Sequence, residues 1–326
     1  MRSRALQTSS MPILLIYGPT ASGKSALGVD LARHFDGEII NTDSMQVYQG
    51  LPVITAQPNV DEKNGIPHHL YGHMDIDQSG SVARWRDEAL ATIKDVKKRG
   101  KMPILVGGTG LYFEALTRGL ADVPPVGDKA VAQAATVLEN GGMEALRTEV
   151  ARIDPAAAAR IQGGDQQRLL RALSVYFQTG TALSDFHKNT HPALPAGSWC
   201  AMSLKPPRDI LYERITHRFT EMLQIGALDE AHFAAQRAVS QTRPAMKALG
   251  LNALVCHIKG QIGLEDATQS AVRDTRRYAK RQYTWGAGRF SHWPVIQGET
   301  SAQRFEEALR IVENSNGAWG ASEEQA

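Results

Sequence analysis

Cysteine is scarce in this chain, and its scarcity limits the classes of protein to which the chain can belong. The 326 residues include two cysteines, Cys200 and Cys256, which lie far apart and lack the spacing of a metal site. We therefore expect two reduced, buried thiols, as in a cytoplasmic protein. A disulfide framework is excluded by the same observation.

Long apolar runs and an excess of one charge are also absent. No run approaches the ~18 apolar residues of a membrane helix, and the leader MRSRALQTSS precedes no apolar segment of signal-peptide type. We expect no membrane contact, a disordered extension over residues 1–10 with Met11 as an alternative start, and a disordered tail over residues 316–326. The net charge is +2, so any nucleic-acid surface must be local.

What the chain does contain is an alternation of buried strands and helices. Continuous apolar runs predict strands over residues 12–18, 37–44 and 101–110. Helical spacing of apolar residues predicts helices over residues 25–35 and 81–100, the second closed by a glycine. This order predicts an α/β fold with a parallel sheet and flanking helices, in which ligands bind at the carboxyl ends of the strands.

The pattern becomes purely helical in the middle of the chain. We expect residues 121–196 to form a helical insertion, because they carry little strand signal. Residues 11–120 and 197–315 then form a P-loop α/β core with C-terminal helices. One helix of that core is predicted over residues 208–226, and its buried face consists of Leu211, Ile215, Phe219 and Met222.

A complete phosphate-binding loop follows the first strand. The sequence GPTASGKS has the G-x-x-x-x-G-K-S pattern between a strand and a helix. The backbone N–H groups of residues 21–24 are expected to face the phosphates, Lys24 to reach the terminal phosphate, and Ser25 to ligate Mg²⁺. The predicted phosphate-binding residues are Gly18, Pro19, Thr20, Ala21, Ser22, Gly23, Lys24 and Ser25.

The acidic partner of an ATP-hydrolysing site is missing from its usual place. Such sites hold Mg²⁺ with an Asp at the end of a second apolar strand, but the strand PILVGG ends in glycine. Asp43 ends the other candidate strand, where it is a metal ligand, a proton acceptor for an incoming nucleophile, or a surface carboxylate. Thr109, in the turn GGTG, either donates to a bridging phosphate oxygen or forms a tight turn.

A dense basic cluster lies near the C-terminus, in AVRDTRRYAKRQYTW. Its cations are Arg273, Arg276, Arg277, Lys280 and Arg281, and they share the stretch with one acid, Asp274. Tyrosines interleave with the cations, which favours an RNA surface, although a solvated helix face gives the same pattern. Three histidines close together in the sequence, His68, His69 and His73, suggest a zinc site. No further ligand has suitable spacing, so a structural or substrate-orienting role is favoured.

Together these motifs resemble the tRNA dimethylallyltransferases, also called tRNA isopentenyltransferases. The resemblance rests on seven segments in family order and covers about residues 12–293: GPTASGKS, DSMQVYQGLPVITAQP, PHHLYGHMD, PILVGGTGLYFEAL, DQQRLLRAL, LYERITHRFTEML and TRRYAKRQYTW. It implies transfer of the five-carbon group of dimethylallyl diphosphate to the exocyclic amine of the adenosine just 3′ of the tRNA anticodon, with release of diphosphate. The phosphate loop would then hold a leaving group rather than ATP.

The resemblance also implies roles for individual residues. Asp43 matches the general base, Thr109 the threonine on the bridging oxygen, and Arg218 an arginine on the diphosphate. The implied partners are tRNA and dimethylallyl diphosphate, with Mg²⁺ as cofactor, and we expect a monomer. The tRNA-contacting segments match Asp43, Ser44, Met45, Gln46, Gln167, Arg168, Leu169, Leu170, Arg171, Met246, Lys247, Ala248, Leu249, Gly250 and Leu251, to which the basic cluster adds Arg277, Lys280 and Arg281.

The chain departs from the family pattern at a few positions. Gln57 stands where lysine is usual, and Leu251 and Asn252 stand where tyrosine and a polar or acidic residue are common. The residues themselves leave two other functions possible. The protein could be a prenyltransferase that acts on free adenine nucleotides, or an RNA-binding NTPase or small-molecule kinase. The helical insertion and the basic cluster favour a macromolecular acceptor, and the missing acid after PILVGG disfavours the kinase.

Overall fold

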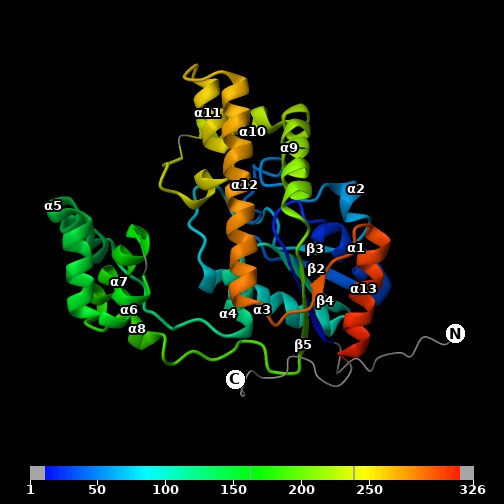
Figure 1. The fold of residues 1–326 in the computed structure, drawn as a ribbon, viewed down its shortest axis with the longest axis horizontal. Helices are drawn as coiled ribbons and strands as arrows, with labels where there is room; N and C mark the ends of the chain where they lie inside the picture. Colours follow the sequence, from blue (N-terminus) through cyan, green and yellow to red (C-terminus); the bar gives the residue numbers. More distant parts are fainter. Residues whose placement is uncertain (1–11, 162, 238, 316–326) are drawn as a thin grey trace. The chain divides into compact units, whose positions relative to one another are not determined.

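The computed structural model divides into two compact units (Figure 1). One unit comprises residues 12–113 and 194–315, and the other comprises residues 114–193. The division falls within helix α4 (Gly110–Thr117), and most of the expected insertion, residues 121–196, belongs to the second unit. The structure describes residues 12–161, 163–237 and 239–315.

The predictions made for the two ends of the chain lie outside the described residues. These are the disordered extension over residues 1–10, the alternative start at Met11, and the disordered tail over residues 316–326. Among the residues that the structure does describe, no helix combines the length and the apolar character needed to cross a membrane.

A parallel sheet forms the centre of the first unit and confirms the predicted fold class. In the described residues it has six strands in the order β3-β2-β4-β1-β5-β6. The continuous apolar runs of its inner strands are buried on both faces, as parallel strands require. The strands are β1 (Ile13–Tyr17), β2 (Gly37–Asn41), β3 (His68–His69), β4 (Met102–Gly107), β5 (Trp199–Leu204) and β6 (Val295–Ile296).

The register brings three strand ends to one edge of the sheet. Tyr17 of β1 pairs with Gly107 of β4, and Asn41 of β2 pairs with Val106. The chain therefore leaves the sheet for the phosphate loop, the Asp43 segment and the GGTG turn at the same level. The second predicted strand was too long, because β2 ends at Asn41, where the side chain of that residue begins hydrogen bonding to the backbone of the following turn.

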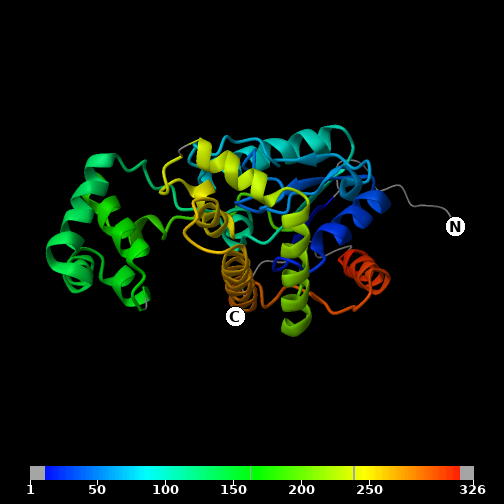
Figure 2. The same ribbon diagram turned by 90° about the horizontal axis from the view of Figure 1, so that it is seen from above.

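Helices cover both faces of this sheet. Figure 2 shows α3 (Val82–Lys98) on one side and α1 (Lys24–Phe35) with α13 (Ser301–Asn314) on the other. Alternate strand residues such as Leu14, Ile16 and Ile104 share a core with Leu31 of α1 and Val312 of α13. A short helix, α2 (Val60–Lys63), lies in the connection between β2 and β3.

A group of helices beyond β5 completes the first unit. The members are α9 (Arg208–Gln224), α10 (Ala227–Gln236), a 3₁₀ turn η1 (Pro244–Lys247), α11 (Leu251–Ile258) and α12 (Leu264–Arg289). The predicted core face of α9 is confirmed, since Leu211, Ile215, Phe219 and Met222 are all buried.

Arg276 fastens the long helix α12 to α9, which lies beside it in Figures 1 and 2. Its Nη2 donates to Thr216 Oγ1 at 2.8 Å, and its guanidinium lies 5.3 Å from the centre of the Tyr212 ring. One cation of the predicted basic cluster therefore braces the fold.

The second unit is helical, as its sequence pattern predicts. It contains α5 (Asp128–Ile153), α6 (Pro155–Arg160), α7 (Gln166–Thr179) and α8 (Leu183–Phe186). Leu146 and Val150 of α5 pack with Leu169 and Leu173 of α7 in one buried cluster. Asp154 caps α6 through the N–H of Ala157, and its other oxygen accepts from the N–H of Ser184, so one buried carboxylate joins two helices.

The histidines and cysteines have structural surroundings. His69 Nε2 lies 2.6 Å from Glu38 Oε2, and His73 Nε2 lies 3.0 Å from Glu88 Oε2. No cluster of three or more candidate metal ligands occurs among the described residues. Cys200 is buried as expected, but Cys256 is only half-buried, because it lies near the end of the short helix α11.

Candidate active site

The phosphate loop leads from β1 directly into the N-terminus of α1. Gly23 is the N-cap residue of α1, with φ of 89°, and no side chain caps this helix end. The first turn of the helix also lacks an acidic residue. The backbone N–H groups and the positive end of the helix dipole are therefore available to an anion. Ala21 also has a left-handed backbone, with φ of 63°, a conformation that is uncommon for residues other than glycine.

Two cations, Lys24 of the loop and Arg218 of α9, lie at the phosphate loop. Arg218 Nη2 of α9 donates to Thr20 Oγ1 at 2.5 Å, and Lys24 Nζ donates to the carbonyl of Pro19 at 3.2 Å. Neither side chain is ion-paired within the described residues. Burial lowers the pKa of Lys24 to about 8, with the Asp43 charge raising it and Arg218 lowering it further, and burial also lowers the pKa of Arg218. A bound anion would stabilise the charged form of both groups.

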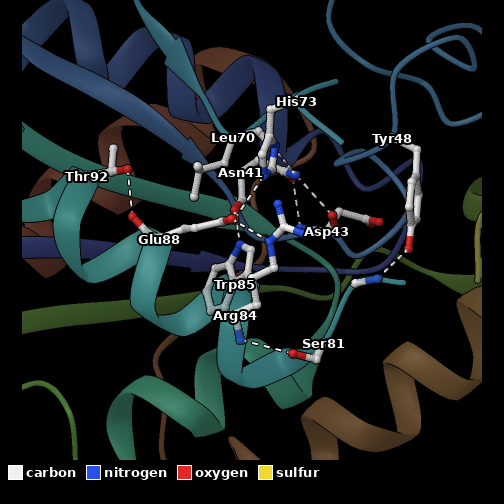
Figure 3. A network of polar contacts seen from close by, with 11 residues as sticks. Asn41, Asp43, Tyr48, Leu70, His73, Ser81, Arg84, Trp85, Glu88 and Thr92 are labelled. Atoms are coloured by element: carbon white, nitrogen blue, oxygen red, sulfur yellow. Dashed lines mark hydrogen bonds and ion pairs between the residues drawn. The ribbon is translucent and has the colours of Figure 1, made fainter. Parts of the chain in front are cut away.

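Asn41 determines where Asp43 lies. Figure 3 shows Asn41 between Asp43, Leu70 and Trp85. Asn41 Oδ1 accepts from the Asp43 N–H at 2.8 Å, and Asn41 Nδ2 donates to the carbonyls of Asp43 and Leu70, each at 3.0 Å. The Asn41 carbonyl in turn accepts from Trp85 Nε1 of α3 at 3.0 Å. The backbone of Asp43 is thus held rigidly, while its carboxylate faces a cavity.

The same network continues along α3 in Figure 3. Glu88 accepts from Arg84 Nε at 2.8 Å and contacts His73 Nε2 at 3.0 Å. The Arg84 N–H donates to Ser81 Oγ at 3.1 Å, which caps the helix. These contacts tie the segment after β3 to the start of α3 and so support Trp85.

Thr109 links the GGTG turn to the Asp43 segment. Its N–H donates to the Thr42 carbonyl at 3.2 Å, and its Oγ1 accepts from the Ser44 N–H at 2.9 Å. Thr109 Oγ1 also lies 3.3 Å from Ser44 Oγ. The hydroxyl oxygen is therefore oriented by the backbone, and its proton is available to Ser44 or to a ligand. Both interpretations of the motif, a tight turn and a hydroxyl at the strand ends, are compatible with this geometry.

One cavity of the first unit joins these groups to an apolar wall. Asp43, Thr20, Arg218 and Tyr278 form its polar side. The loop carrying Ile54 is held in place by buried Glu230, which accepts from the N–H groups of Val53 and Ile54. The apolar lining consists of Met45, Ile54, Ala56, Ile215, Phe219, Met222 and Leu249.

The segments predicted to touch tRNA divide by exposure. The exposed members are Gln167, Arg168 and Arg171 of the second unit and Lys247, Arg277, Lys280 and Arg281 of the first. Ser44, Met45, Gln46, Leu170, Leu249 and Gly250 are partly accessible. The side chains of Leu169, Met246, Ala248 and Leu251 are buried in their cores. Contact of these segments with tRNA stays a prediction, which for these four residues would involve the backbone.

Two glutamines of the Asp43–Gln57 segment hold the segment itself together. Gln46 Nε2 donates to the carbonyls of Thr55 and Ala56, and Gln57 Nε2 donates to the Tyr48 carbonyl at 2.8 Å. Gln57, which stands where lysine is usual in the family, therefore helps to stabilise the fold of this segment.

Sequence reasoning missed two residues that shape the site. Asn41 was counted within a strand, although a polar residue in the apolar run EIIN was a signal that it had a specific partner. Tyr278 was interpreted as an aromatic of a nucleic-acid surface, but it lines the cavity with Asp43, and burial raises its pKa. Tyr278 lies one helical turn from Thr275, which also lines the cavity. The sequence alone does not reveal this role, because it depends on where α12 packs.

The residues present suit a Mg²⁺ ion that arrives with a phosphate ligand. Ser25 is exposed at the N-terminus of α1, and the buried Oγ of Ser22 in the same loop lacks a hydrogen-bond partner among the described residues. Mg²⁺ at phosphate sites is commonly held by one or two protein oxygens, substrate phosphates and water. Ser25 would hold the ion, which would neutralise charge on a departing diphosphate.

The fold and the site together define an α/β protein with a phosphate-loop sequence, next to a cavity that has an apolar wall and the carboxylate of Asp43. A family model described as IPP transferase matches residues 46–289. The chain therefore belongs to the IPP transferase family, and it is a prenyltransferase.

Relatives and solved structures agree with this assignment. The chain is similar to the tRNA dimethylallyltransferase of Maricaulis maris, with 51% identity over 285 residues that cover 87% of this chain and 92% of the relative. That of Hyphomonas neptunium is 45% identical, with coverages of 92% and 94%. The tRNA isopentenylpyrophosphate transferase of Bacillus halodurans gives a TM-score of 0.67 at 31% identity, covering 94% of this chain and 98% of the other. A eukaryotic dimethylallyltransferase acting on tRNA gives 0.79 at 27% identity, covering 95% and 81%.

Proposed function

We propose that this chain transfers the dimethylallyl group of dimethylallyl diphosphate to the exocyclic amine of the adenosine 3′-adjacent to the tRNA anticodon, releasing diphosphate. The observation that carries the proposal is the cavity beside the phosphate loop. It joins a buried cation, Arg218, to an apolar wall and a carboxylate, Asp43, and the phosphate loop that supplies Thr20 to its lining also carries Lys24. A prenyl diphosphate has the matching parts, an anionic head and an apolar tail, and an amine acceptor requires a group that takes its proton.

Each part of the cavity then has one task. Lys24, Arg218 and the N-terminus of α1 hold the diphosphate, and the Thr109 hydroxyl donates to its bridging oxygen. The apolar residues enclose the five-carbon chain and exclude water, which would otherwise consume an allylic cation-like centre. Asp43 accepts a hydrogen from the adenosine amine and takes its proton as the new C–N bond forms. We expect this work to be done on tRNA in the cytoplasm by a monomer.

Transfer to free adenine nucleotides is the second candidate. The exposed cations of α7 in the second unit, and separately those of α12 in the first unit, favour a macromolecular acceptor, because a mononucleotide does not need basic side chains on either helix. Mass spectrometry of nucleosides from tRNA incubated with the enzyme and dimethylallyl diphosphate tests the proposal. We expect one dimethylallyl adenosine per substrate tRNA. Modification of AMP without modification of tRNA would reject it, and so would turnover of ATP with no prenyl transfer.

The affinity for prenyl diphosphate should fall above about pH 8. The pKa of Lys24 is about 8 in the free protein, and a bound anion raises it. Binding is therefore strongest below the free-protein pKa, where Lys24 is already charged, and above it each pH unit should cost up to about tenfold in affinity. Calorimetric titrations in buffers of different ionisation heat should show that the protein takes up a proton when it binds the diphosphate above this pH.

Lys24→Arg is the matched control for this pH dependence. Arginine stays charged throughout the range, and the ionisation of the ligand itself is the same for both proteins. The variant should lack the proton uptake of the parent protein. Equal proton uptake by the two proteins would assign the titration to another group.

The double substitution Arg277→Ala, Lys280→Ala should weaken tRNA binding and reduce its dependence on salt. Both side chains are exposed on α12, and Arg277 forms a 3.4 Å ion pair with Asp274. If each contacts a phosphate, the slope of log affinity against log salt should flatten by about one per residue. Lys94→Ala with Lys98→Ala removes two exposed cations of α3 and serves as the control. An unchanged slope in the α12 variant would give this helix a structural role only.

A further inference from the structure

Gln282 of α12 lies buried where three segments of the first unit meet. Its side chain is 4% exposed. Nε2 donates to the carbonyl of Gly108 at 2.9 Å, and Oε1 accepts from the N–H of Thr20 at 2.9 Å. Its main-chain carbonyl accepts from the Tyr17 hydroxyl at 2.5 Å. One amide thus joins the phosphate loop to the GGTG turn.

The turn is built to let this amide approach. A Cβ at Gly108 would lie 2.1 Å from Gln282 Nε2 and 3.0 Å from the Gly18 carbonyl, far inside van der Waals contact. Glycine is therefore required at position 108 for Gln282 to reach both loops. The helix itself comes close for the same reason at Gly286, where a Cβ would lie 2.6 Å from the Tyr17 ring.

The two bonds of the amide act on the two loops that hold the diphosphate. Thr20, whose N–H is bound by Gln282, carries the hydroxyl that accepts from Arg218 at 2.5 Å. Gly108, whose carbonyl is bound by Gln282, directly precedes Thr109. A displacement of either loop would move Arg218 or Thr109 relative to the other, and a displacement of about 1 Å can cost about 10²-fold in rate.

We propose that Gln282 is a positioning residue for the transfer reaction, which sets the phosphate loop and the GGTG turn at the spacing that the diphosphate needs. The proposal rests on the proposed function of the site. An amide is required, because it must donate to one loop and accept from the other. A carboxylate could not donate to Gly108, and it would add a negative charge beside the diphosphate. Gln282 acts through Thr20 and Thr109 and does not itself contact the ligand.

The test compares Gln282→Met with Tyr17→Phe. Both variants remove buried hydrogen bonding at the junction of α12 and β1, but only the first releases the two loops. Inorganic diphosphate is the binding probe, measured by calorimetry, alongside the melting temperature, kcat and donor KM. We expect Gln282→Met to weaken diphosphate binding and lower kcat/KM by about 10–100-fold, as loss of a supporting hydrogen bond typically does. Tyr17→Phe should lower the melting temperature and leave both quantities unchanged.

Gly108→Ala provides a second approach that keeps the glutamine at position 282. The added Cβ displaces the Gln282 amide from the opposite side and should reproduce the loss in diphosphate affinity. Because both changes act on one contact, the double variant should lose much less than the product of the single losses. Multiplicative losses would overturn the proposal, and so would a Gln282→Met protein that binds diphosphate as Tyr17→Phe does. If the parent protein transferred no prenyl group, the proposed function would fail, while the diphosphate comparison would still decide the role of Gln282.

Discussion

Asp43→Asn is expected to lower the single-turnover rate of prenyl transfer by about 10²–10⁴-fold, the range for loss of a general base. The adenosine amine is a poor nucleophile, because its lone pair is delocalised into the ring. A carboxylate that accepts one of its hydrogens aligns the amine with the departing diphosphate and takes the proton as the bond forms. Asparagine has the same shape but is a far weaker proton acceptor.

The structure indicates that this variant should fold and bind normally. The backbone of Asp43 is held by Asn41, and Asp43 Oδ1 accepts from the Met45 N–H at 2.9 Å, a bond that an asparagine oxygen can also accept. We therefore expect donor and tRNA affinities close to those of the parent protein. The adenosine must flip out of its stack, which costs a few kcal/mol. Contacts elsewhere on the tRNA offset this free-energy cost, so the substitution should not affect it.

The competing account makes Asp43 a magnesium ligand. That account predicts weaker donor binding in the Asn variant and a rate restored by excess magnesium, so magnesium is titrated against the single-turnover rate. Restoration would overturn the general-base role. Asp87→Asn, at an exposed carboxylate of α3, is the control for a change of one charge.

Lys24→Ala should weaken the binding of dimethylallyl diphosphate by about 10²-fold, while tRNA affinity stays nearly intact. The ammonium group makes charge-assisted contacts to a multiply charged leaving group, and removal of one donor from such an anion site typically costs about 10²–10³-fold. Its only hydrogen bond among the described residues is to the carbonyl of Pro19, so the side chain is available to a ligand.

Calorimetry with dimethylallyl diphosphate and a tRNA filter-binding assay measure the two affinities of the Lys24 variant. Lys94→Ala, an exposed lysine of α3, is the matched control and should change neither. Unchanged donor affinity in Lys24→Ala would contradict the phosphate-loop assignment. The pH dependence should be lost with the same substitution, because the group that titrates is gone.

Local patterns predicted much of the fold correctly. The continuous apolar runs before Gly18 and Gly107 identified parallel strands, and the spacing of Leu211, Ile215 and Phe219 identified the buried face of α9. The end of β2 was predicted too late and Cys256 was predicted to be buried, since both depend on partners that are distant in sequence. The buried side chains of Leu169 and Met246 illustrate the same limit, because a family segment does not reveal which of its side chains face inward.

By itself the sequence determined the phosphate loop and the family resemblance, because a strand, a glycine turn and a helix start are specified by neighbouring residues. It also determined that Lys24 and Asp43 follow strands, and hence that they lie at one edge of a parallel sheet. Only the tertiary structure decided which cations serve the fold and which face a ligand. Arg276 and Arg277 are adjacent in the chain, yet one braces α9 and the other is exposed.

The position of the Gln282 amide between the phosphate loop and the GGTG turn was likewise decided only by the tertiary structure. Thr20, Gly108 and Gln282 come from three separate parts of the chain, and their two hydrogen bonds exist only after α12 has packed against β1. Hydrogen bonds depend on distances of a few tenths of an ångström, and such distances between remote segments are set by packing of the whole core rather than by local spacing.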